Sequence, residues 1–391
     1  MAAWKVAQND HSVVIIDRRK AVGLPIQCGE GISEYALTTN DLEADDAWIR
    51  QRINGARIFV PNEKHILVTG KGYAIDRSIF DQSIADKAVA AGAELSLETT
   101  VKSIEKHEDD QGTYWNLSII RGGSGGGIGE TIEARYIVGA DGPHSIVAGW
   151  AGIRYKAENV LGYQYKFPAE YVKQNLRYEF QGQSRLQGEW LDFHYANRWP
   201  NGYVWVFPRG DTYNIGICGP GILHAQLDEY CKENGLDPSK KIATEAGQIP
   251  RGTIIPTFVK NNVLIVGDAA GLTNPLTKGG IHAAIFSGRQ AGLALHDAIA
   301  NGTPELAMKY EIVMKAAKFT DPQMMEHGKL IYSLTDDAAN FVGDLLNEQD
   351  YTAFSCIKSI IPILRNPRLL PFVPRLLKIL KALEISSVYG W

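Results

Sequence analysis

The chain has 391 residues, which is enough for two or three domains and a large hydrophobic core. Its formal net charge is −4 at pH 7, so its overall field gives no reason to expect nucleic-acid binding. None of the four cysteines, Cys28, Cys218, Cys231 and Cys356, has CxxC or metal-ligand spacing. We therefore expect a cytoplasmic protein with no disulfide framework and no metal site. No signal peptide precedes the first helix, and no apolar run has the ~20 residues that a membrane span needs.

The beginning of the chain resembles the second half of a dinucleotide-binding βαβ unit. Ala3, Val6 and Ala7 have helical spacing, residues 12–16 form an apolar strand, and Asp17 follows that strand. An acid in this position binds the ribose hydroxyls of an adenosine. The strand and the G-x-G-x-x-G loop that should come first are not in the sequence. We therefore expect that the chain lacks roughly 20 residues, as a truncated gene model would.

The next stretch predicts a loop, a hairpin and a helix. Glycines and a proline in residues 18–31 favour a loop, and residues 56–73 alternate as hairpin strands do. Asp76 is expected to cap a helix that begins near Arg77. Its apolar side is predicted to consist of Ile79, Phe80, Ile84, Ala88 and Val89.

Strands are then predicted at 94–105 and 114–121, followed by a glycine-rich connection at 122–129. That connection fails as a phosphate-binding loop because it leads into another strand, so we interpret it as a hairpin turn. The strand at 134–140 ends in GADG, which places Asp141 and Gly142 before a helix that begins at Ser145. A buried strand, a glycine and an acid in this order are typical of a nucleotide-binding turn.

Residues 160–219 are rich in aromatic side chains that alternate with others, which predicts a large antiparallel sheet. Tyr203, Trp205 and Phe207 alternate along one strand and so share one of its faces. These three rings form either a flat apolar wall of a binding site or a part of the sheet core.

The most informative stretch is residues 262–290. Val263–Val266 read as a buried parallel strand, and the turn after it carries Gly267 and a single acid, Asp268. Gly279 and Gly280 then open a helix from Ile281, so free N–H groups and a helix dipole can face an anion. A reduced flavin carries such a charge at N1, whereas a generic tight turn is the simpler interpretation of GDAAG alone.

Beyond residue 301 the chain is predicted to be helical. Five cations, Arg365, Arg368, Arg375, Lys378 and Lys381, are interleaved with apolar residues and prolines near the end of the chain. Such a pattern is typical of a basic amphipathic stretch on an anionic membrane surface. A C-terminal helix packed on its own domain explains it equally well.

GADG followed by GDAAGLTNPLTKGGI resembles the FAD-dependent oxidoreductases of aromatic-hydroxylase architecture, and among them the geranylgeranyl reductase family. YVWVFP resembles the substrate-wall motif of that family, although its closing G-x-G is Gly216-Ile217-Cys218 here. The resemblance implies an α/β fold with a Rossmann-type FAD domain, similar to glutathione reductase, an inserted antiparallel β-sheet substrate domain and a C-terminal helical region. The FAD domain would comprise residues 1–55, 74–155 and 247–301, the substrate domain 56–73 and 156–246, and the helical region 302–391.

The resemblance also implies site residues. Cys28, Gly29 and Glu30 match a cysteine-containing segment near the flavin, and Arg77 matches an arginine there; a buried apolar thiol and a solvated surface arginine are the alternatives. The residues expected to bind FAD are Asp17, Cys28, Gly29, Arg77, Val101, Asp141, Gly142, Gly267, Asp268, Gly279, Gly280 and Ile281. The expected substrate wall is Tyr203, Trp205, Phe207 and Pro208. Cys28 and Tyr203 are the candidate proton donors, beside a flavin-bound proton or an ordered water.

The function that the resemblance implies is reduction of isolated double bonds in a geranylgeranyl chain by hydride from N5 of reduced FAD. An archaeal ether lipid is the first choice of substrate, before a chlorophyll or quinone tail, and ferredoxin, a reduced nicotinamide or a deazaflavin would supply the electrons. Contact with the inner face of the cell membrane would give access to the lipid. The alternatives are a flavin-dependent aromatic monooxygenase or halogenase, and a non-catalytic lipid-binding protein derived from a flavin fold.

Overall fold

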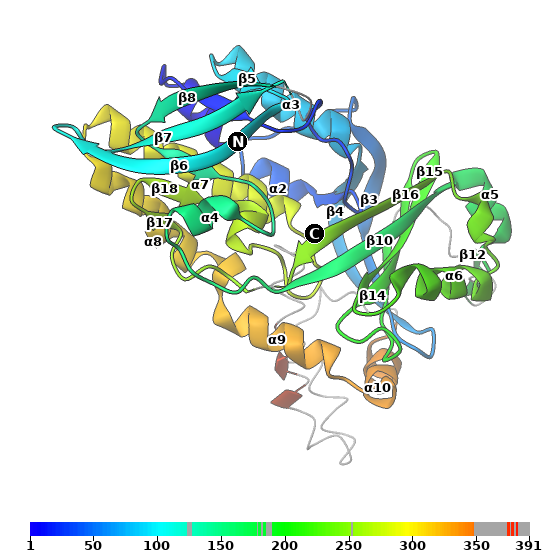
Figure 1. Cartoon of the computed structure of the whole chain (residues 1–391). Coiled ribbons are helices and arrows are strands. Elements are labelled where there is room, and N and C mark those ends of the chain that lie inside the picture. The colour runs from blue at the N-terminus through cyan, green and yellow to red at the C-terminus, as the bar shows by residue number, and fades with distance from the viewer. Residues whose placement is uncertain are drawn as a thin grey trace.

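The computed structural model describes residues 1–122, 127–177, 179–180, 183–184, 190–251 and 253–347, and also 374–375, 377–378 and 381. Within them, a nucleotide-binding part and a large mixed sheet lie side by side, and two helices extend from their junction (Figure 1). This is the predicted α/β class, with the predicted sheet domain and helical region.

The nucleotide-binding part contains short parallel strands with helices packed around them. β1 pairs in parallel with β5, β9 pairs in parallel with β18, and β17 pairs antiparallel with β18. The three residues of β18 are apolar and fully buried, as expected for a strand covered on both sides. These strands are β1 (Val14–Ile16), β5 (Glu94–Ser96), β9 (Ile137–Gly139), β17 (Val259–Lys260) and β18 (Val263–Ile265). Their helices are α1 (Ala2–Ala7), α3 (Arg77–Ala90), α4 (Ile146–Trp150), α7 (Ile281–Ala300) and α8 (Met308–Ala316).

Helix α3 begins where the sequence predicts, because Asp76 accepts hydrogen bonds from the first backbone N–H groups. Its predicted apolar side is only partly correct. Phe80 and Ala88 are buried, but Ile79 and Val89 are exposed. The buried side of α3 is therefore narrower than the set of five apolar residues predicts.

An antiparallel sheet of three strands covers the nucleotide-binding part. It contains β6 (Thr99–Asp109), β7 (Gly112–Arg121) and β8 (Ile128–Ala134). The glycine-rich stretch joins β7 to β8, which confirms a hairpin connection, although residues 123–126 lie outside the described chain.

The large sheet has eight strands in the order β16-β10-β15-β14-β13-β3-β4-β2. Every neighbouring pair is antiparallel except β13 and β3. The strands are β2 (Gly31–Ser33), β3 (Ile49–Phe59), β4 (His65–Ile75), β10 (Asn159–Pro168), β13 (Trp190–His194), β14 (Tyr203–Arg209), β15 (Thr212–Gly219) and β16 (Ala243–Pro250). A separate small hairpin contains β11 (Glu179–Phe180) and β12 (Gln183–Ser184).

Three predicted domain boundaries fall inside strands of this sheet. The boundary at residue 55 cuts β3, the one at 74 cuts β4, and the one at 247 cuts β16. The first half of β3 reads IRQRIN, and its polar residues hide the alternation from which the prediction began. The sheet domain is therefore larger than predicted and also includes β2.

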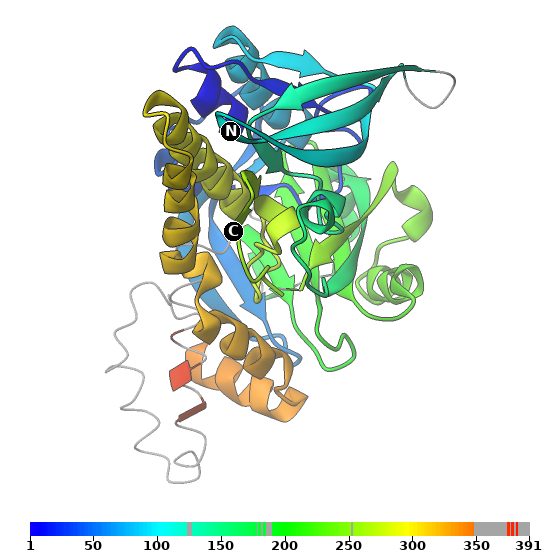
Figure 2. The ribbon, with the colours of Figure 1, turned by 60° about the vertical axis from the view of Figure 1, so that its left-hand side comes forward.

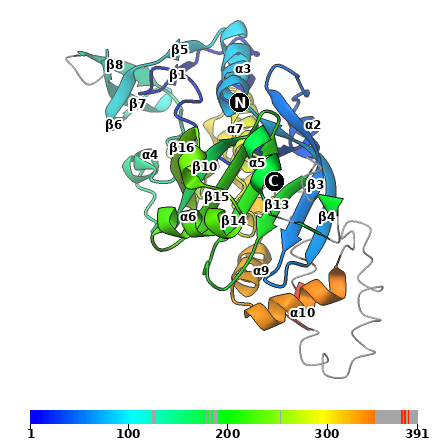
Figure 3. The same ribbon diagram turned by 90° about the vertical axis from the view of Figure 1, so that its right-hand side faces the viewer.

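The two faces of the sheet have different covers. Helices α5 (Ala169–Asn175) and α6 (Leu223–Glu233) pack on one face, against Val204, Val206 and Ile215 of β14 and β15 (Figure 3). The opposite face carries the side chains of Tyr203, Trp205 and Phe207 in a second apolar cluster. The three rings therefore share one face, as predicted.

Helices α9 (Pro322–Tyr332) and α10 (Asp336–Leu346) close this second cluster at one end, where they follow α7 and α8 (Figure 2). Among the described residues, no helix is both long and apolar enough to cross a bilayer. Arg365 and Arg368 of the predicted basic stretch lie outside the described residues, whereas Lys381 donates to Gln323 of α9 at 3.2 Å. Short connecting segments complete the fold, namely α2 (Glu34–Thr38) and the 3-10 turns Pro238–Lys240, Gly267–Ala270, Pro304–Ala307 and Lys318–Thr320.

Candidate active site

The first nucleotide-binding turn, GADG, ends β9 and leads into α4. The carboxylate of Asp141 accepts hydrogen bonds from the hydroxyl of Ser145 at 2.6 Å and from the backbone N–H groups of Ile146 at 2.7 Å and Val147 at 3.1 Å. These bonds satisfy N–H groups that a helix start otherwise leaves unpaired. The side chain of Asp141 therefore holds α4, and a contact with FAD stays a prediction, as it does for Gly142.

The second turn, GDAAG, follows β18. Gly267 has φ of 55°, and its N–H donates to the hydroxyl of Ser287 in α7 at 3.0 Å. Burial raises the pKa of the Asp268 carboxyl to about 6, and the nearby charge of Arg77 acts in the opposite direction. Among the described residues no donor reaches this carboxylate. Asp268 thus presents an acceptor for a ligand hydroxyl.

Helix α7 begins beside Asp268 without a side-chain cap. Gly280 is its N-cap, and α7 is 20 residues long, so its first N–H groups and its dipole can act on an anion. A Cβ added to Gly280 would lie 3.1 Å from Oδ1 of Asp268 and 3.2 Å from Cγ2 of Thr273. Only glycine leaves this cradle open. An uncapped helix start beside an acid without a donor fits FAD.

The Cys28 loop and the start of α3 lie at the same place. The charge of Arg77 acts on the thiol of Cys28, and its guanidinium pairs with Asp81 through two contacts of 2.9 and 2.8 Å. The same guanidinium acts electrostatically on Asp268. Burial raises the pKa of Cys28, so its sulfur carries a proton at neutral pH. The structure therefore brings together Cys28, Arg77 and Asp268, which are far apart in the sequence.

Glu30 is fully buried and ties the Cys28 loop to the large sheet. Its carboxylate pairs with Lys166 at 3.2 Å and Arg209 at 3.0 Å, and it accepts from the amide of Asn214 at 3.0 Å. Its other oxygen accepts from the backbone N–H of Arg77 at 3.1 Å. Paired buried charges of this kind hold a loop in one position. Glu30 thus anchors the loop.

The aromatic face of β14 lies against the same loop. A Cβ added to Gly29 would be 3.1 Å from the ring of Phe207 and 3.7 Å from the indole of Trp205. The indole N–H donates to Gln164 at 3.1 Å, and the Gln164 amide donates to the backbone carbonyl of Cys28 at 2.8 Å. Pro208 falls on the opposite face by strand alternation, so the predicted wall does not include it.

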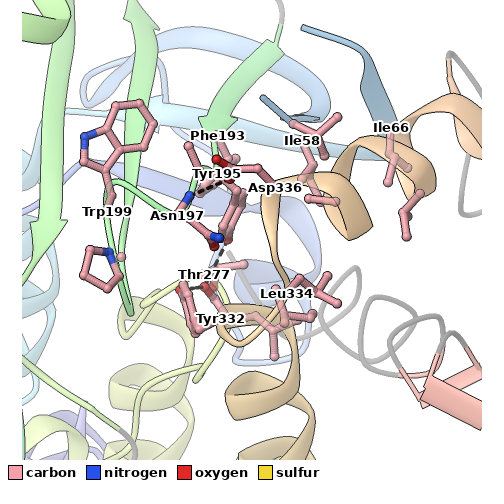
Figure 4. Close-up of a pocket in the computed structure, with 18 of the residues that line it drawn as sticks. Ile58, Ile66, Phe193, Tyr195, Asn197, Trp199, Thr277, Tyr332, Leu334 and Asp336 are labelled. Carbon is pink, nitrogen blue, oxygen red and sulfur yellow. Dashed lines mark hydrogen bonds between the residues drawn. The ribbon is translucent and has the colours of Figure 1, made fainter. Parts of the chain in front are cut away.

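An apolar cavity lies between the large sheet and helices α9 and α10, and it offers about 110 Å³ to the centres of water-sized molecules (Figure 4). Its walls come from β3, β4, β13, the segment 195–202, Leu276, Thr277 and the two helices. The lining residues that Figure 4 labels are Ile58, Ile66, Phe193, Tyr195, Asn197, Trp199, Thr277, Tyr332, Leu334 and Asp336. Phe193 and Tyr195 line the cavity, whereas its lining does not include the predicted wall residues Tyr203, Trp205, Phe207 and Pro208.

The hydroxyls of Tyr195 and Tyr332, which line the cavity, and of the neighbouring Tyr203 already have acceptors. Tyr195 and Tyr332 donate to the backbone carbonyl of Leu276 at 3.2 and 2.5 Å, and Tyr203 donates to that of Thr277. These carbonyls belong to the segment between Gly271 and Gly280, which we call the flavin loop. Three tyrosine hydroxyls therefore fix the position of this loop. The lining of the cavity therefore consists mostly of rings and aliphatic groups, with Asn197, Thr277 and Asp336 as its polar members.

Other predicted residues occupy different places. Asp17 ends β1 and accepts from the backbone N–H of Arg19 at 2.9 Å, while Val101 lies half-buried in β6. Tyr195, Tyr332 and Gln164 were not predicted, because each belongs to a stretch without a recognisable motif. The clustering of aromatic residues in 160–219 was the only signal for Tyr195.

Residues 73–186 of the chain match the sequence family described as "FAD binding domain". Digeranylgeranylglycerophospholipid reductase of Methanocaldococcus jannaschii is 30% identical over 400 aligned residues, which cover 96% of this chain and 95% of that protein. The chain belongs to the digeranylgeranylglycerophospholipid reductase family. It is an FAD-dependent oxidoreductase, and the motif resemblance is confirmed.

Solved structures agree with this family. A geranylgeranyl bacteriochlorophyll reductase-like protein of Thermoplasma acidophilum is 25% identical and has a TM-score of 0.80, with 96% of this chain and 95% of that one covered. The flavin-dependent brominase Bmp2 is 14% identical, with a TM-score of 0.64 and coverage of 99% and 90%. That second likeness shows the fold alone, so the halogenase alternative has only a distant neighbour.

Proposed function

We propose that this chain reduces the isolated double bonds of geranylgeranyl chains in an archaeal ether phospholipid, with FAD as its cofactor. Family membership supports the class of reaction, and the observation that carries the substrate class is the apolar cavity beside the flavin loop. Because its tyrosine hydroxyls donate to backbone carbonyls, it offers a prenyl chain dispersion contacts and few competing polar groups.

The residues of the chain divide into those that bind FAD and those that bind the lipid. Asp268 would accept a hydrogen bond from a hydroxyl of FAD, and the N–H groups at the start of α7 would stabilise negative charge on the reduced cofactor. When bound, reduced FAD supplies hydride from N5 to one alkene carbon while a proton is added to the other. Trp205 and Phe207 beside the Cys28 loop would align the alkene, and helices α9 and α10, which line the cavity, would keep water from the lipid chain.

Cys28 is the side-chain proton donor that the geometry favours. Its thiol is protonated, it lies in the loop that packs on Trp205 and Phe207, and it accepts from the backbone N–H of Glu30 at 3.2 Å. The hydroxyl of Tyr203 already donates to the carbonyl of Thr277, and burial raises its pKa well above the ordinary value. We therefore assign Tyr203 to holding the flavin loop.

Two further parts of the proposal concern partners. Ferredoxin, a reduced nicotinamide or a deazaflavin would supply the electrons that reduce FAD. The basic C-terminal stretch would bring the chain to the inner face of the cell membrane, where the substrate resides. Lys329, Arg375 and Lys378 surround a surface hollow beside α9, so cations do gather at that end of the molecule.

The decisive experiment is an anaerobic single-turnover reaction. Purified protein is loaded with FAD, reduced with dithionite and mixed with digeranylgeranylglycerophospholipid, and the lipid is analysed by mass spectrometry. We expect the lipid to gain dihydrogen as the flavin is oxidised. A flavin that stays reduced beside unchanged lipid would refute the function, and oxygen consumption with a phenol would favour the monooxygenase alternative.

A matched pair of variants tests the cavity. Ala339→Trp places an indole in the cavity wall of α10, whereas Ile312→Trp changes a side chain of α8 that is 69% exposed. We expect the first variant to bind FAD but to lose lipid reduction at least tenfold, and the second to behave as the wild type. Equal activity of both variants would show that the chain enters elsewhere.

A further inference from the structure

Six charged side chains of the described residues are almost inaccessible to solvent: Lys5, Glu30, Asp192, Arg209, Lys278 and Glu311. Five of them have a partner of opposite charge. The pairs are Lys5 with Asp41, Glu30 with Lys166, Asp192 with Arg57, Arg209 with Asp76, and Glu311 with Lys315. Lys278 has no such partner in the part of the chain that the structure describes.

The surroundings of Lys278 contain a carbonyl and a ring in place of a carboxylate. The side chain is 8% exposed, and its Nζ donates to the backbone carbonyl of Pro275 at 2.7 Å. The ammonium also lies over the ring of Tyr332, 4.6 Å from its centre. Burial lowers the pKa of Lys278 to about 8, with Cys218 acting in the opposite direction and Arg251 in the same one. At neutral pH the group is therefore still mostly charged.

This arrangement is costly for the fold alone. A buried charge without a counter-ion loses its hydration and gains little in return. The backbone of Lys278 also has φ of 58°, a conformation that favours glycine over residues with a Cβ. A glycine in this position would remove both costs, so the retained charge points to a ligand that compensates it.

The place of Lys278 in the chain indicates which ligand this is. Lys278 lies two residues before Gly280, the N-cap of α7, so the segment that leads into this helix start carries a positive charge. Leu276, Thr277 and Tyr332 line the apolar cavity, but Lys278 does not. The ring of Tyr332 lies under the ammonium, and Lys278 itself belongs to the segment that leads to the start of α7.

We propose that Lys278 is a positioning charge for reduced FAD. Its fixed ammonium favours the negative charge that FAD holds at N1 after it takes up two electrons and one proton, and so raises the reduction potential of the bound cofactor. The inference rests on the proposed function, because that function supplies the flavin and its electron donor. It adds a residue whose effect acts through the electrostatic field of the site.

The test uses the full-length protein with FAD bound. Lys278→Met removes the charge at similar length, Lys278→Arg keeps it, and Lys278→Gly removes it while easing the backbone. The midpoint potential of bound FAD is measured by dye equilibration, and the affinity for sulfite by absorbance. Sulfite bonds through sulfur to N5 of oxidised flavin and leaves negative charge at N1, so both measurements report the same field.

We expect Lys278→Met and Lys278→Gly to shift the potential to more negative values and to weaken sulfite binding at least tenfold. Lys278→Arg should stay close to the wild type. Lys309→Met is the control, because Lys309 is an exposed lysine paired with Asp297. If the methionine variant fails to fold, the glycine variant decides.

Unchanged potential and sulfite affinity in the charge-removing variants would overturn the proposal. Unchanged potential together with weaker phospholipid binding would also overturn it and would assign the charge to the lipid. A wild-type protein that does not retain FAD would instead refute the premise of the proposed function. The two failures are therefore distinguishable.

Discussion

The turns at Asp141 and Asp268 look alike in the sequence, yet their carboxylates have different surroundings. Each aspartate follows a short parallel strand and a glycine; Asp141 precedes α4, and Asp268 lies in the 3-10 turn Gly267–Ala270. Asp141 is exposed and accepts three hydrogen bonds from Ser145, Ile146 and Val147. Asp268 is half-buried, and no donor of the described residues reaches its carboxylate. The carboxylate of Asp141 therefore stabilises the start of α4, whereas that of Asp268 can accept a hydrogen bond from a ligand.

This difference shows that the sequence motif identifies the turn but does not tell whether its carboxylate binds a ligand. The hydrogen-bond donors around the carboxylate decide this, because a carboxylate whose acceptor sites are filled gains little from a further hydroxyl. Variants at the two aspartates should therefore separate FAD binding from stability.

The largest effect should follow from Asp268→Ala. A hydrogen bond to a charged group contributes about 1.5 to 3 kcal/mol, which is roughly a 10- to 100-fold loss in affinity when it is removed. The measurement is the dissociation constant of FAD from quenching of its fluorescence. Asp141→Ala is the matched control, and equal FAD affinity in both variants would break the comparison.

The affinity for FAD should also depend on pH. In the protein without FAD the pKa of Asp268 is raised to about 6 by burial. A hydroxyl that donates to the carboxylate favours the charged form, so binding releases a proton below this pH. We expect the affinity to rise as pH increases toward 6, by up to about tenfold per pH unit, and to level off above it.

Isothermal titration of FAD between pH 4.5 and 7.5 measures this dependence, with Asp268→Asn as the reference. The amide does not titrate, so the variant should bind weakly with a flat profile. A wild-type profile that falls as pH rises would contradict the assignment of Asp268 as a charged acceptor.

Much of the fold and part of the site could be predicted because they depend on local patterns. The apolar run of β18, the glycines after it and the alternation of Tyr203, Trp205 and Phe207 are local signals, and the structure confirms the elements that they predict. Glu30 shows where such reasoning ends. Its partners Lys166 and Arg209 are more than a hundred residues away, on strands whose register no local pattern reveals.

The cavity was equally hard to foresee. Its tyrosines, Tyr195 and Tyr332, come from β13's end and from α9, and their shared acceptor is the carbonyl of Leu276. A hydroxyl that donates to a backbone group leaves no trace in the sequence. The beginning of β3 was missed for a related reason, because its polar side chains interrupt the alternation.

A smaller effect is expected for Asp141→Ala, and it should concern stability. The substitution leaves the N–H groups of Ile146 and Val147 without their acceptor at the start of α4. Loss of such capping lowers the free energy of unfolding by about 1 to 2 kcal/mol. Urea denaturation of the FAD-free protein measures the loss, and a tenfold fall in FAD affinity would contradict the structural role.

The smallest effect is expected for Gly149→Ala, in the helix that Asp141 caps. Gly149 is exposed, and a Cβ added there meets no atom within 4 Å, so the alanine side chain causes no clash. Alanine in a helix interior is more favourable than glycine by about 0.5 to 1 kcal/mol, because it restricts the unfolded chain. We therefore expect a modest rise in the urea midpoint and unchanged FAD affinity.

If α4 contributes only to the fold, the stability gained in Gly149→Ala and the stability lost in Asp141→Ala should add in the double variant, while the FAD dissociation constant stays that of the wild type. A changed dissociation constant would instead place α4 in the FAD site and remove the distinction between the two turns.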